Sequence, residues 1–406
     1  MSHHADTIRT YLFSGLMTAR QLSEKMGVSQ PTLSRELIKL GNEIVRIGTA
    51  RAIQYALRDS SRGLPNIPVY QVSIAGTIRK LGTLIPVRQD GFVLRQEDGT
   101  TLHSDSVPWW MFDMLPQGYL GRAYAGRHGI GLGLTTKLNQ WTDADKVRAL
   151  LAHGYDAVGN LLLGDTAREY FLNASESNLI SDELKSQEYA RLALEAARGE
   201  IPGSSAGGEQ PKFTSYAMTP NGPQHVIVKF NELDENPVTE RWRDLLYAEH
   251  LALETLRDAG ISAAPTQIID NGYQRFLEVE RFDRIGKQGR CAVHSLTALD
   301  LEFVGKGIES WVVIVQQLAN DGQIIPEAIN NTSLLWAFGT LIGNTDMHNG
   351  NLSFISEQGR PYTLAPAYDM TPMAFAPRSG GGLPDRIPEP NIAAIINNET
   401  WRHALK

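Results

Sequence analysis

A short polar segment, "NTDMHNGN" at residues 344–351, combines an Asp, a His and several Asn between apolar flanks. Asp346 and Asn351 have the D-x-x-x-x-N spacing of a kinase catalytic loop, in which the Asp accepts the proton of the substrate hydroxyl and the Asn holds Mg²⁺. Asp369, in "AYDMTP", follows where a second metal carboxylate is expected. Oxygen ligands suit Mg²⁺, so the pattern predicts phosphoryl transfer. The alternative is a polar turn between two strands.

His348 in the same segment raises the question of a transition-metal site. Zinc is usually held by several His or Cys side chains at short spacing. No H-x-x-x-H pair or Cys accompanies His348. We therefore expect His348 to position phosphates or the catalytic loop.

A catalytic loop of this kind needs a phosphate-binding cation, and Lys229 is the candidate. It lies near the end of "QHVIVKFNE", a segment rich in β-branched residues that predicts a strand. The amphipathic segment 239–260 follows and carries Glu249 beside an apolar stripe. A strand lysine held by a helix carboxylate is how kinases aim a cation at the α- and β-phosphates. The alternative is an exposed lysine that closes the strand.

Two further segments have the composition of nucleotide contacts. Residues 201–212, "IPGSSAGGEQPK", contain three glycines that would let the backbone approach a phosphate. They match neither a Walker A loop nor G-x-G-x-x-G, so an ordinary flexible turn is the alternative. Residues 273–284, "YQRFLEVERFDR", predict an apolar strand that breaks into charge, as a hinge between two lobes would.

Composition bounds the architecture that positions these residues. A chain of 406 residues predicts two or more domains, and 42% hydrophobic residues predict a globular protein. The single cysteine, Cys291, fits a reducing cytoplasm, and neither a signal peptide nor an apolar run of membrane-spanning length is present. Residues 1–60 hold eight Lys or Arg against five acidic residues, whereas the whole chain has a net charge of -7. A basic unit on an acidic body suggests a polyanion-binding module.

The basic N-terminal segment has the pattern of a winged helix-turn-helix. Apolar spacing predicts three short helices, with Thr18 as an N-cap, Gly27 ending the second helix and Pro31 near the start of the third. Residues 43–58 alternate around a Gly-centred turn, as a two-stranded wing would. We expect the start of the third helix to enter a DNA major groove, with two basic residues near phosphates. The DNA-contact candidates are Gln30, Thr32, Ser34, Arg35, Lys39 and Arg51. Winged helices that dimerise or dock proteins are the alternative.

Several quoted stretches, in this order, resemble the HipA-like serine/threonine kinases, which are toxins of bacterial toxin–antitoxin systems. They are "VPWWMFDMLP", "GYDAVGNLLL", "SAGGEQPK", "VIVKF", "LEVERFDR", "NTDMHNGNLSF" and "APAYDM", and the match covers roughly residues 68–380. A kinase of this kind behind a winged helix is similar to the YjjJ-like branch. The resemblance implies an α+β fold, with a two-lobed, protein-kinase-like HipA fold preceded by a small winged helix-turn-helix. The expected division is 1–58 for the DNA-binding unit, 59–67 for a linker, 68–175 for a HipA N-terminal subdomain, 176–283 for the first kinase lobe and 284–406 for a helical second lobe.

The resemblance also implies roles for individual positions, with ATP and Mg²⁺ as cofactors. The implied catalytic base is Asp346, and the implied metal ligands are Asn351 and Asp369. The choice of Glu249 rather than Glu240 as the partner of Lys229 comes from the apolar stripe of its helix. The implied ATP contacts are Gly207, Gly208, Glu209, Gln210, Pro211, Lys212, Lys229, Glu280, Arg281, Phe282, His348, Asn349, Gly350, Asn351, Tyr368 and Asp369. The autophosphorylated loop serine of the family aligns with Ser205, with Ser204 adjacent. The implied partners are a protein substrate, DNA and a HipB-like antitoxin.

Two departures from the family leave alternatives open. The family usually has a longer helical portion after "YDMTP", whereas 37 residues follow Asp369 here, so we expect either a short version or a truncated chain. The best-known members lack a winged helix, so we expect DNA reading in cis. The alternatives are a small-molecule phosphotransferase of the aminoglycoside or choline kinase type, whose loops resemble "DMHNGN", and a DNA-binding regulator with a nucleotide-sensing kinase domain.

Overall fold

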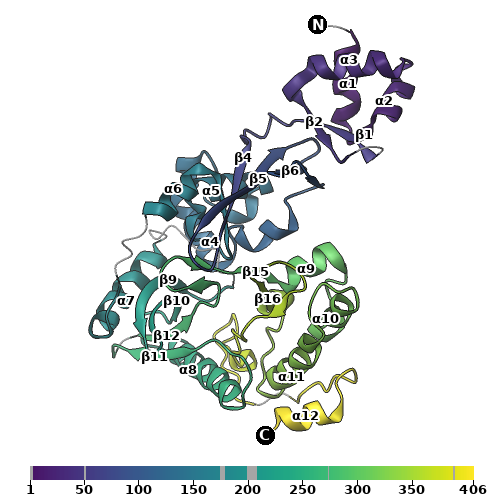
Figure 1. Cartoon of the computed structure of the whole chain (residues 1–406). Coiled ribbons are helices and arrows are strands. Elements are labelled where there is room, and N and C mark those ends of the chain that lie inside the picture. The colour runs from purple at the N-terminus through teal and green to yellow at the C-terminus, as the bar shows by residue number, and fades with distance from the viewer. Residues whose placement is uncertain (1–2, 50–51, 174–178, 199–207, 273, 387–388) are drawn as a thin grey trace.

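A computed structural model describes residues 3–49, 52–173, 179–198, 208–272, 274–386 and 389–406. Four units follow one another along the chain: an N-terminal unit (residues 3–57), a middle unit (67–173), a first lobe (182–283) and a second lobe (284–404). Figure 1 shows the N-terminal unit at one end of the molecule, the middle unit next to it, and the two lobes side by side beyond. Within the described residues, no helix combines the length and apolar character needed to cross a membrane.

The N-terminal unit packs three helices against a small antiparallel sheet with strand order β1-β3-β2. Thr18 caps the second helix through a capping box with Gln21, and Gly27 ends this helix with a left-handed φ of 65°. Both signals are local, which is why the sequence pattern located this helix. The elements are α1 (His3–Phe13), β1 (Met17–Thr18), α2 (Ala19–Met26), α3 (Gln30–Leu40), β2 (Ile44–Ile47) and β3 (Gln54–Leu57).

The segment expected to be a linker is packed rather than free. Asp59 is 2% exposed and forms ion pairs with Arg62 and Arg88. Leu64 is buried in the core of the middle unit, and Ile67, the last residue of the expected linker, already begins β4. Burial of a carboxylate requires such partners, so residues 59–67 fix the N-terminal unit to the middle unit.

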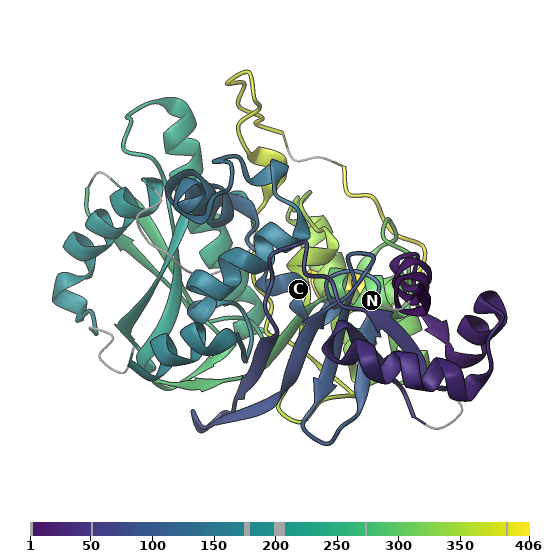
Figure 2. The ribbon, with the colours of Figure 1, turned by 90° about the horizontal axis from the view of Figure 1, so that it is seen from above.

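The wing contributes to the same contact. Val45 and Ile47 of β2 and Ala56 of β3 form one buried apolar cluster with side chains of β5 and β6 in the middle unit. Figure 2, seen from above, likewise places the N-terminal helices beside the strands of the middle unit and away from the first lobe. The N-terminal unit and the middle unit therefore share a core.

The middle unit is an antiparallel five-stranded sheet with order β7-β6-β5-β4-β8 and helices that pack on it. The adjacent tryptophans Trp109 and Trp110 are both half-buried: Trp109 packs on the core of the second lobe and Trp110 on that of the middle unit. The elements are β4 (Ile67–Val72), β5 (Ile78–Pro86), β6 (Phe92–Gln96), β7 (Thr101–Ser104), η3 (Trp109–Met114), α4 (Gly118–His128), α5 (Asp143–His153), β8 (Leu161–Leu163) and α6 (Gly164–Asn173).

The first lobe is an antiparallel sheet with order β11-β12-β10-β9 between two helices. Along β10, Val226, Val228 and Phe230 pack in one cluster with α7. Side chains of a strand alternate between faces, so Ile227 and Lys229 lie on the other face, the face of α8. The elements are α7 (Asp182–Ala197), β9 (Lys212–Thr219), β10 (Gly222–Phe230), α8 (Pro237–Asp258), β11 (Thr266–Asp270) and β12 (Arg275–Glu280).

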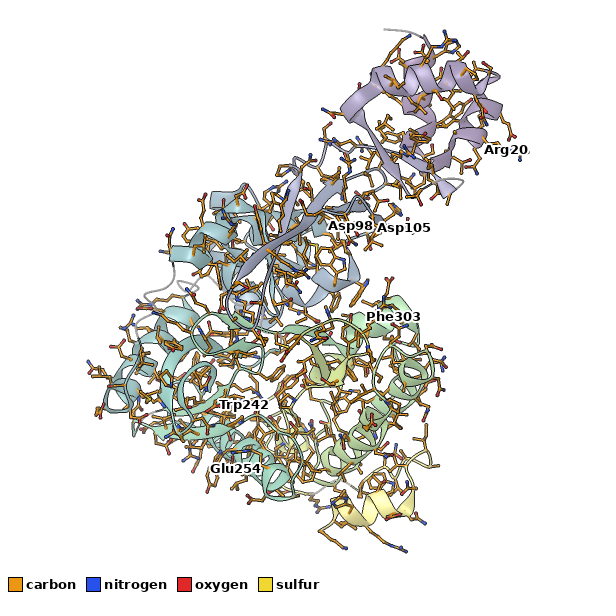
Figure 3. All side chains as sticks on the ribbon, in the orientation of Figure 1. Arg20, Asp98, Asp105, Trp242, Glu254 and Phe303 are labelled. Carbon is orange, nitrogen blue, oxygen red and sulfur yellow. The ribbon has the colours of Figure 1, made fainter. Side chains whose placement is uncertain are left out.

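The second lobe is mainly helical and holds the largest apolar cluster, centred on α9, α10 and α11. Figure 3 places Phe303, near the end of α9, on the side that faces the middle unit, where its ring lies 5.2 Å from that of Trp109. The elements are β13 (Arg284–Ile285), β14 (Gly289–Arg290), β15 (Ala292–Ser295), α9 (Leu296–Phe303), α10 (Trp311–Asn320), α11 (Glu327–Leu341), η8 (Asn349–Asn351), β16 (Ser353–Ser356), β17 (Thr363–Leu364), η9 (Met373–Phe375) and α12 (Asn398–Ala404).

Candidate active site

A cavity of about 320 Å³ lies where the two lobes meet the middle unit. Apolar side chains line it from all three parts, including Val158 of the middle unit, Ile227 and Val279 of the first lobe and Val293 of the second. Charged and amide groups converge on the same cavity. A concave site of this size, with apolar walls and convergent polar groups, is the usual form of a small-molecule site.

Lys229 supplies the central cation of the cavity. It is 5% exposed, and its Nζ lies 2.7 and 2.8 Å from the two carboxylate oxygens of Glu249 and 2.6 Å from Oδ1 of Asp369. Burial disfavours the charged ammonium, but the two carboxylates outweigh it and hold the pKa of Lys229 above its ordinary value. Lys229 is therefore a fixed positive charge.

Glu249 comes to this place because α8 buries the face that carries it. Leu246, Leu253 and Leu256 are buried on the same face, and Glu249 itself is 1% exposed. Its Oε2 also accepts a hydrogen bond of 2.7 Å from Thr371. The structure thus brings together the Lys229–Glu249 pair expected from the sequence and adds a link to the segment after Asp369.

Asp369 adopts a left-handed backbone with φ of 57°, which is uncommon outside glycine. Burial raises the pKa of its carboxyl, but Lys229 and Lys212 outweigh this and the pKa is lowered. Strained backbone that is held by surrounding contacts is frequent at functional sites. Asp369 is therefore an ionised carboxylate beside two lysines.

The segment 344–351 is tied together by its own side chains. Oδ1 of Asn344 accepts a hydrogen bond of 3.0 Å from the amide of Asp346, and Nδ2 of Asn351 donates one of 2.9 Å to the carbonyl of Asp346. Asp346 is exposed, yet partial desolvation by the surrounding protein raises the pKa of its carboxyl. Asn351 lines the cavity and is buried.

His348 acts inside this loop. Its Nδ1 accepts a hydrogen bond of 3.0 Å from the amide of Gly350, and its carbonyl accepts one of 3.0 Å from the indole of Trp311. The hydroxyl of Tyr368 donates to the carbonyl of Gly350 at 2.9 Å, while Asn349 donates to Gly307. Through these contacts His348 holds the segment 344–351 in place.

Of the expected glycine-rich loop, residues 201–212, the structure describes the part that begins at Gly208. Ser204, Ser205 and Gly207 lie outside the described residues. Gly208 and Lys212 line the cavity, and burial, followed by repulsion from Lys229, lowers the pKa of Lys212 to about 8.

The three residues between Gly208 and Lys212 make other contacts. Glu209 forms an ion pair with Arg122, Gln210 contacts Met373, and the carbonyl of Pro211 accepts a hydrogen bond from Phe230. None of these three is among the residues that line the cavity.

All three expected hinge residues line the cavity. The ring of Phe282 lies 5.6 Å from that of Tyr368 and lines the cavity. The carboxylate of Glu280 accepts hydrogen bonds from Thr219 and Asn221. The guanidinium of Arg281, whose side chain is 2% exposed, forms ion pairs with acidic residues.

Sequence reasoning missed the contribution of the middle unit. Phe112 and Asp113 line the cavity, and Asp113 accepts a hydrogen bond of 2.7 Å from the amide of Ser295, while burial raises the pKa of its carboxyl. Asp156 forms ion pairs with the Arg281 side chain. Asp113 and Asp156 lie more than a hundred positions before their partners Ser295 and Arg281, and the only signal for them was membership in the stretches "WWMFDMLP" and "YDAVGN".

Five of the six expected DNA-contact residues lie on α3. Gln30, Ser34, Arg35 and Lys39 are exposed, whereas Thr32 is half-buried. Three of these side chains also have partners: Thr32 bonds Ser29, Arg35 donates to the carbonyl of Pro31, and Lys39 pairs with Glu36. Arg51 lies outside the described residues. Figure 3 shows Arg20, on the neighbouring helix α2, at the outer edge of the molecule.

Comparison with known proteins decides the family. Residues 64–172 match the model of the YjjJ-like toxin middle domain, and residues 204–404 match that of the HipA-like C-terminal domain. The toxin YjjJ of Escherichia coli (strain K12) is 38% identical over 396 residues, covering 97% of this chain and 89% of that protein. The chain belongs to the YjjJ-like toxin family. The HipA-like family and the YjjJ-like branch expected from the sequence are thus confirmed.

Solved structures are also similar to this YjjJ-like chain. A chain of the HipA, HipB and operator DNA complex of Shewanella oneidensis MR-1 gives a TM-score of 0.46 at 16% identity and covers 76% of either chain. The proinflammatory kinase CtkA of Helicobacter pylori gives a TM-score of 0.31 at 18% identity, with 39% of this chain and 54% of that chain covered.

Proposed function

We propose that this YjjJ-like protein is a Mg²⁺-dependent serine/threonine protein kinase that uses ATP. The observation that carries the proposal is the placement of Lys229 Nζ within 2.8 Å of both Glu249 oxygens and 2.6 Å of Asp369 Oδ1, in the wall of a cavity that Asn351 also lines. A lysine–glutamate pair beside a metal carboxylate is the arrangement by which kinases bind the α- and β-phosphates. The cavity also offers apolar walls for a flat base.

The residues present fit Mg²⁺ better than a softer metal. Nδ2 of Asn351 is engaged by the carbonyl of Asp346, which leaves its Oδ1 as a ligand beside the carboxylate of Asp369. Among the described residues, no group of three or more His, Cys, Asp or Glu side chains could form a protein-only metal cage. Mg²⁺ is commonly held by one or two protein oxygens together with substrate phosphates. When bound, it would neutralise charge that develops on the phosphates.

In the proposed reaction Asp346 accepts the proton of the attacking serine or threonine hydroxyl. The hydrogen bond that Asp346 donates to Asn344 and the one that it accepts from Asn351 fix its main chain, and His348 fixes the loop that follows. Lys229 and Lys212 hold the phosphates of ATP in place for in-line attack. The new bond joins the hydroxyl oxygen to the γ-phosphorus, and ADP leaves with the electrons of the broken bond.

We extend the proposal to autophosphorylation at Ser205, with Ser204 as the neighbouring candidate. Incubation with γ-labelled ATP followed by peptide mapping tests this extension and the substrate class together. Label on a loop serine or on a protein substrate supports the protein kinase. Label found only on small molecules would instead support the aminoglycoside or choline kinase type.

A second proposed function is DNA binding by α3. Exposed Gln30, Ser34, Arg35 and Lys39 lie within one helix of the basic N-terminal unit, which suits a recognition helix. A gel shift with the protein's own promoter tests it, and binding no tighter than to random DNA at physiological salt would remove it.

We also propose toxicity and restraint by a HipB-like antitoxin, on the strength of the family. Induced expression that arrests growth, with no arrest for Asp346→Asn, would support a toxic kinase. Equal effects of the two proteins would support a DNA-binding regulator that only senses nucleotide.

A further inference from the structure

The described end of the glycine-rich loop rests on the first residues of α4 in the middle unit. The amide of Tyr119 donates a hydrogen bond of 2.9 Å to the carbonyl of Gly208. Gly118 has a φ of 59°, and a Cβ at this position would lie 2.4 Å from the oxygen and 2.9 Å from the nitrogen of Gly208. A Cβ cannot approach main-chain atoms so closely, so only glycine at position 118 permits this contact. Figure 1 places α4 at the boundary between the middle unit and strands β9 and β10.

We call this contact of Gly208 with Gly118 and Tyr119 the seat of Gly208. Two neighbouring contacts extend it. The ring of Tyr119 packs edge-on against that of Phe230, the residue after Lys229 on β10, with ring centres 6.4 Å apart. One turn further along α4, Arg122 pairs with Glu209 on the surface. An exposed ion pair contributes little by itself, so the main-chain contacts of Gly208 define the seat.

The opposite side of Gly208 faces the charged groups of the cavity. A Cβ on Gly208 would lie 2.7 Å from Lys212 Nζ and 3.9 Å from Asp369 Oδ2. Gly208 is therefore held between α4 on one side and a lysine and a carboxylate on the other. A displacement of Gly208 would change the space next to the groups that are proposed to meet phosphate.

We propose that Gly118 and Tyr119 are positioning residues for phosphate recognition. They fix Gly208 beside Lys212 and Asp369, so the middle unit takes part in binding the phosphates although it lies outside the two kinase lobes. The inference rests on the proposed ATP-dependent function and adds a part of the chain that this function does not require. Adenosine has no phosphate, so its binding should not depend on this contact.

Substitution at Gly118 tests the seat. In Gly118→Ala the new Cβ and the unfavourable φ force Gly208 away from α4. We expect the dissociation constants of ATP and ADP, measured by calorimetry on the full-length protein with Mg²⁺, to rise at least tenfold. The dissociation constant of adenosine should stay within twofold of the wild type. Gly126→Ala is the matched control, because this glycine lies in the same helix and a Cβ there meets nothing within 4 Å.

A measurement on the wild type covers the case in which the variant does not fold. Bound phosphates that lock Gly208 should strengthen its hydrogen bond from Tyr119, so ATP should slow hydrogen exchange of the peptide that contains Tyr119, and adenosine should not. Equal protection by both ligands, or equal weakening of ATP and adenosine by Gly118→Ala, would overturn the inference. Unchanged ATP binding in that variant would do so as well. If the wild-type protein binds adenosine and ATP with the same dissociation constant, the proposed function is refuted instead.

Discussion

Replacing Asp156 by Asn tests how the middle unit holds the hinge between the lobes. Asp156 contacts Arg281 at 3.0 and 3.1 Å and Arg284 at 2.8 Å, and both guanidinium groups also pair with Asp283. The two arginine side chains are 2% and 3% exposed. Burial opposes ionisation of Asp156, but the arginines outweigh it and hold the pKa of this carboxyl far below its usual range.

The magnitude follows from the charges that remain. Removing one partner of a buried ion pair costs about 3–5 kcal/mol, because a buried charge is left uncompensated. Asp283 stays in contact with both arginines, so we expect the lower end, about 3 kcal/mol, for Asp156→Asn. One factor of ten corresponds to about 1.36 kcal/mol, so opening of this contact should become roughly 150-fold more frequent.

Hydrogen exchange measured by mass spectrometry reads this opening directly. The amides of Gly159 and Cys291 donate to the side chain and the carbonyl of Asp283, so their peptides should lose protection by about that factor. Adenosine should bind more weakly along with ATP, because the hinge beside Phe282 loosens. Asp143→Asn is the control, since Asp143 is exposed and 3.8 Å from Lys146, and it should change stability by less than about 0.5 kcal/mol. Protection within threefold of the wild type in Asp156→Asn would refute the reasoning.

Three further predictions concern other parts of the chain. Burial lowers the pKa of His294 to about 4, so below pH 6.5 the unfolded chain takes up a proton that the folded protein does not, and stability should fall by about 2 kcal/mol between pH 7.5 and pH 5. Urea unfolding of His294→Phe should lack this loss, and an equal loss in the variant would contradict it. The raised pKa of Asp346 predicts that kinase activity is lost on acidification at a higher pH than an ordinary aspartate would give, because the base must be ionised; a pH–rate profile flat down to pH 4 would exclude this. Arg35→Ala should weaken DNA binding and reduce the slope of log affinity against log salt by about 1 if Arg35 meets a phosphate, whereas an unchanged slope would remove that contact.

Local signals in the sequence were sufficient for much of the fold. Thr18 and Gly27 cap α2 through neighbouring residues, and the alternation along β10 together with the apolar stripe of α8 placed Lys229 opposite Glu249. Each of these features depends on residues within a few turns or one strand. Patterns of this length are written directly into the sequence.

Contacts between segments that are far apart in the chain could not be predicted from the sequence in this way. The packing of the wing on β5 and β6, the ion pairs of Asp156 with Arg281, and the contact of Gly118 with Gly208 each join segments that are far apart in the chain. Nothing in the residues around Arg281 tells whether its guanidinium faces a ligand or a buried carboxylate. Only the tertiary structure makes that distinction.

The central claim is phosphoryl transfer with Asp346 as the base. Its most direct test is the transfer of label from γ-labelled ATP to protein by the wild type and by Asp346→Asn, with ATP affinity measured for both. We predict that the variant binds Mg²⁺ and ATP within twofold of the wild type and incorporates label more slowly by roughly 10² or more. Equal incorporation by the two proteins, or none by the wild type while it binds ATP, would contradict the account.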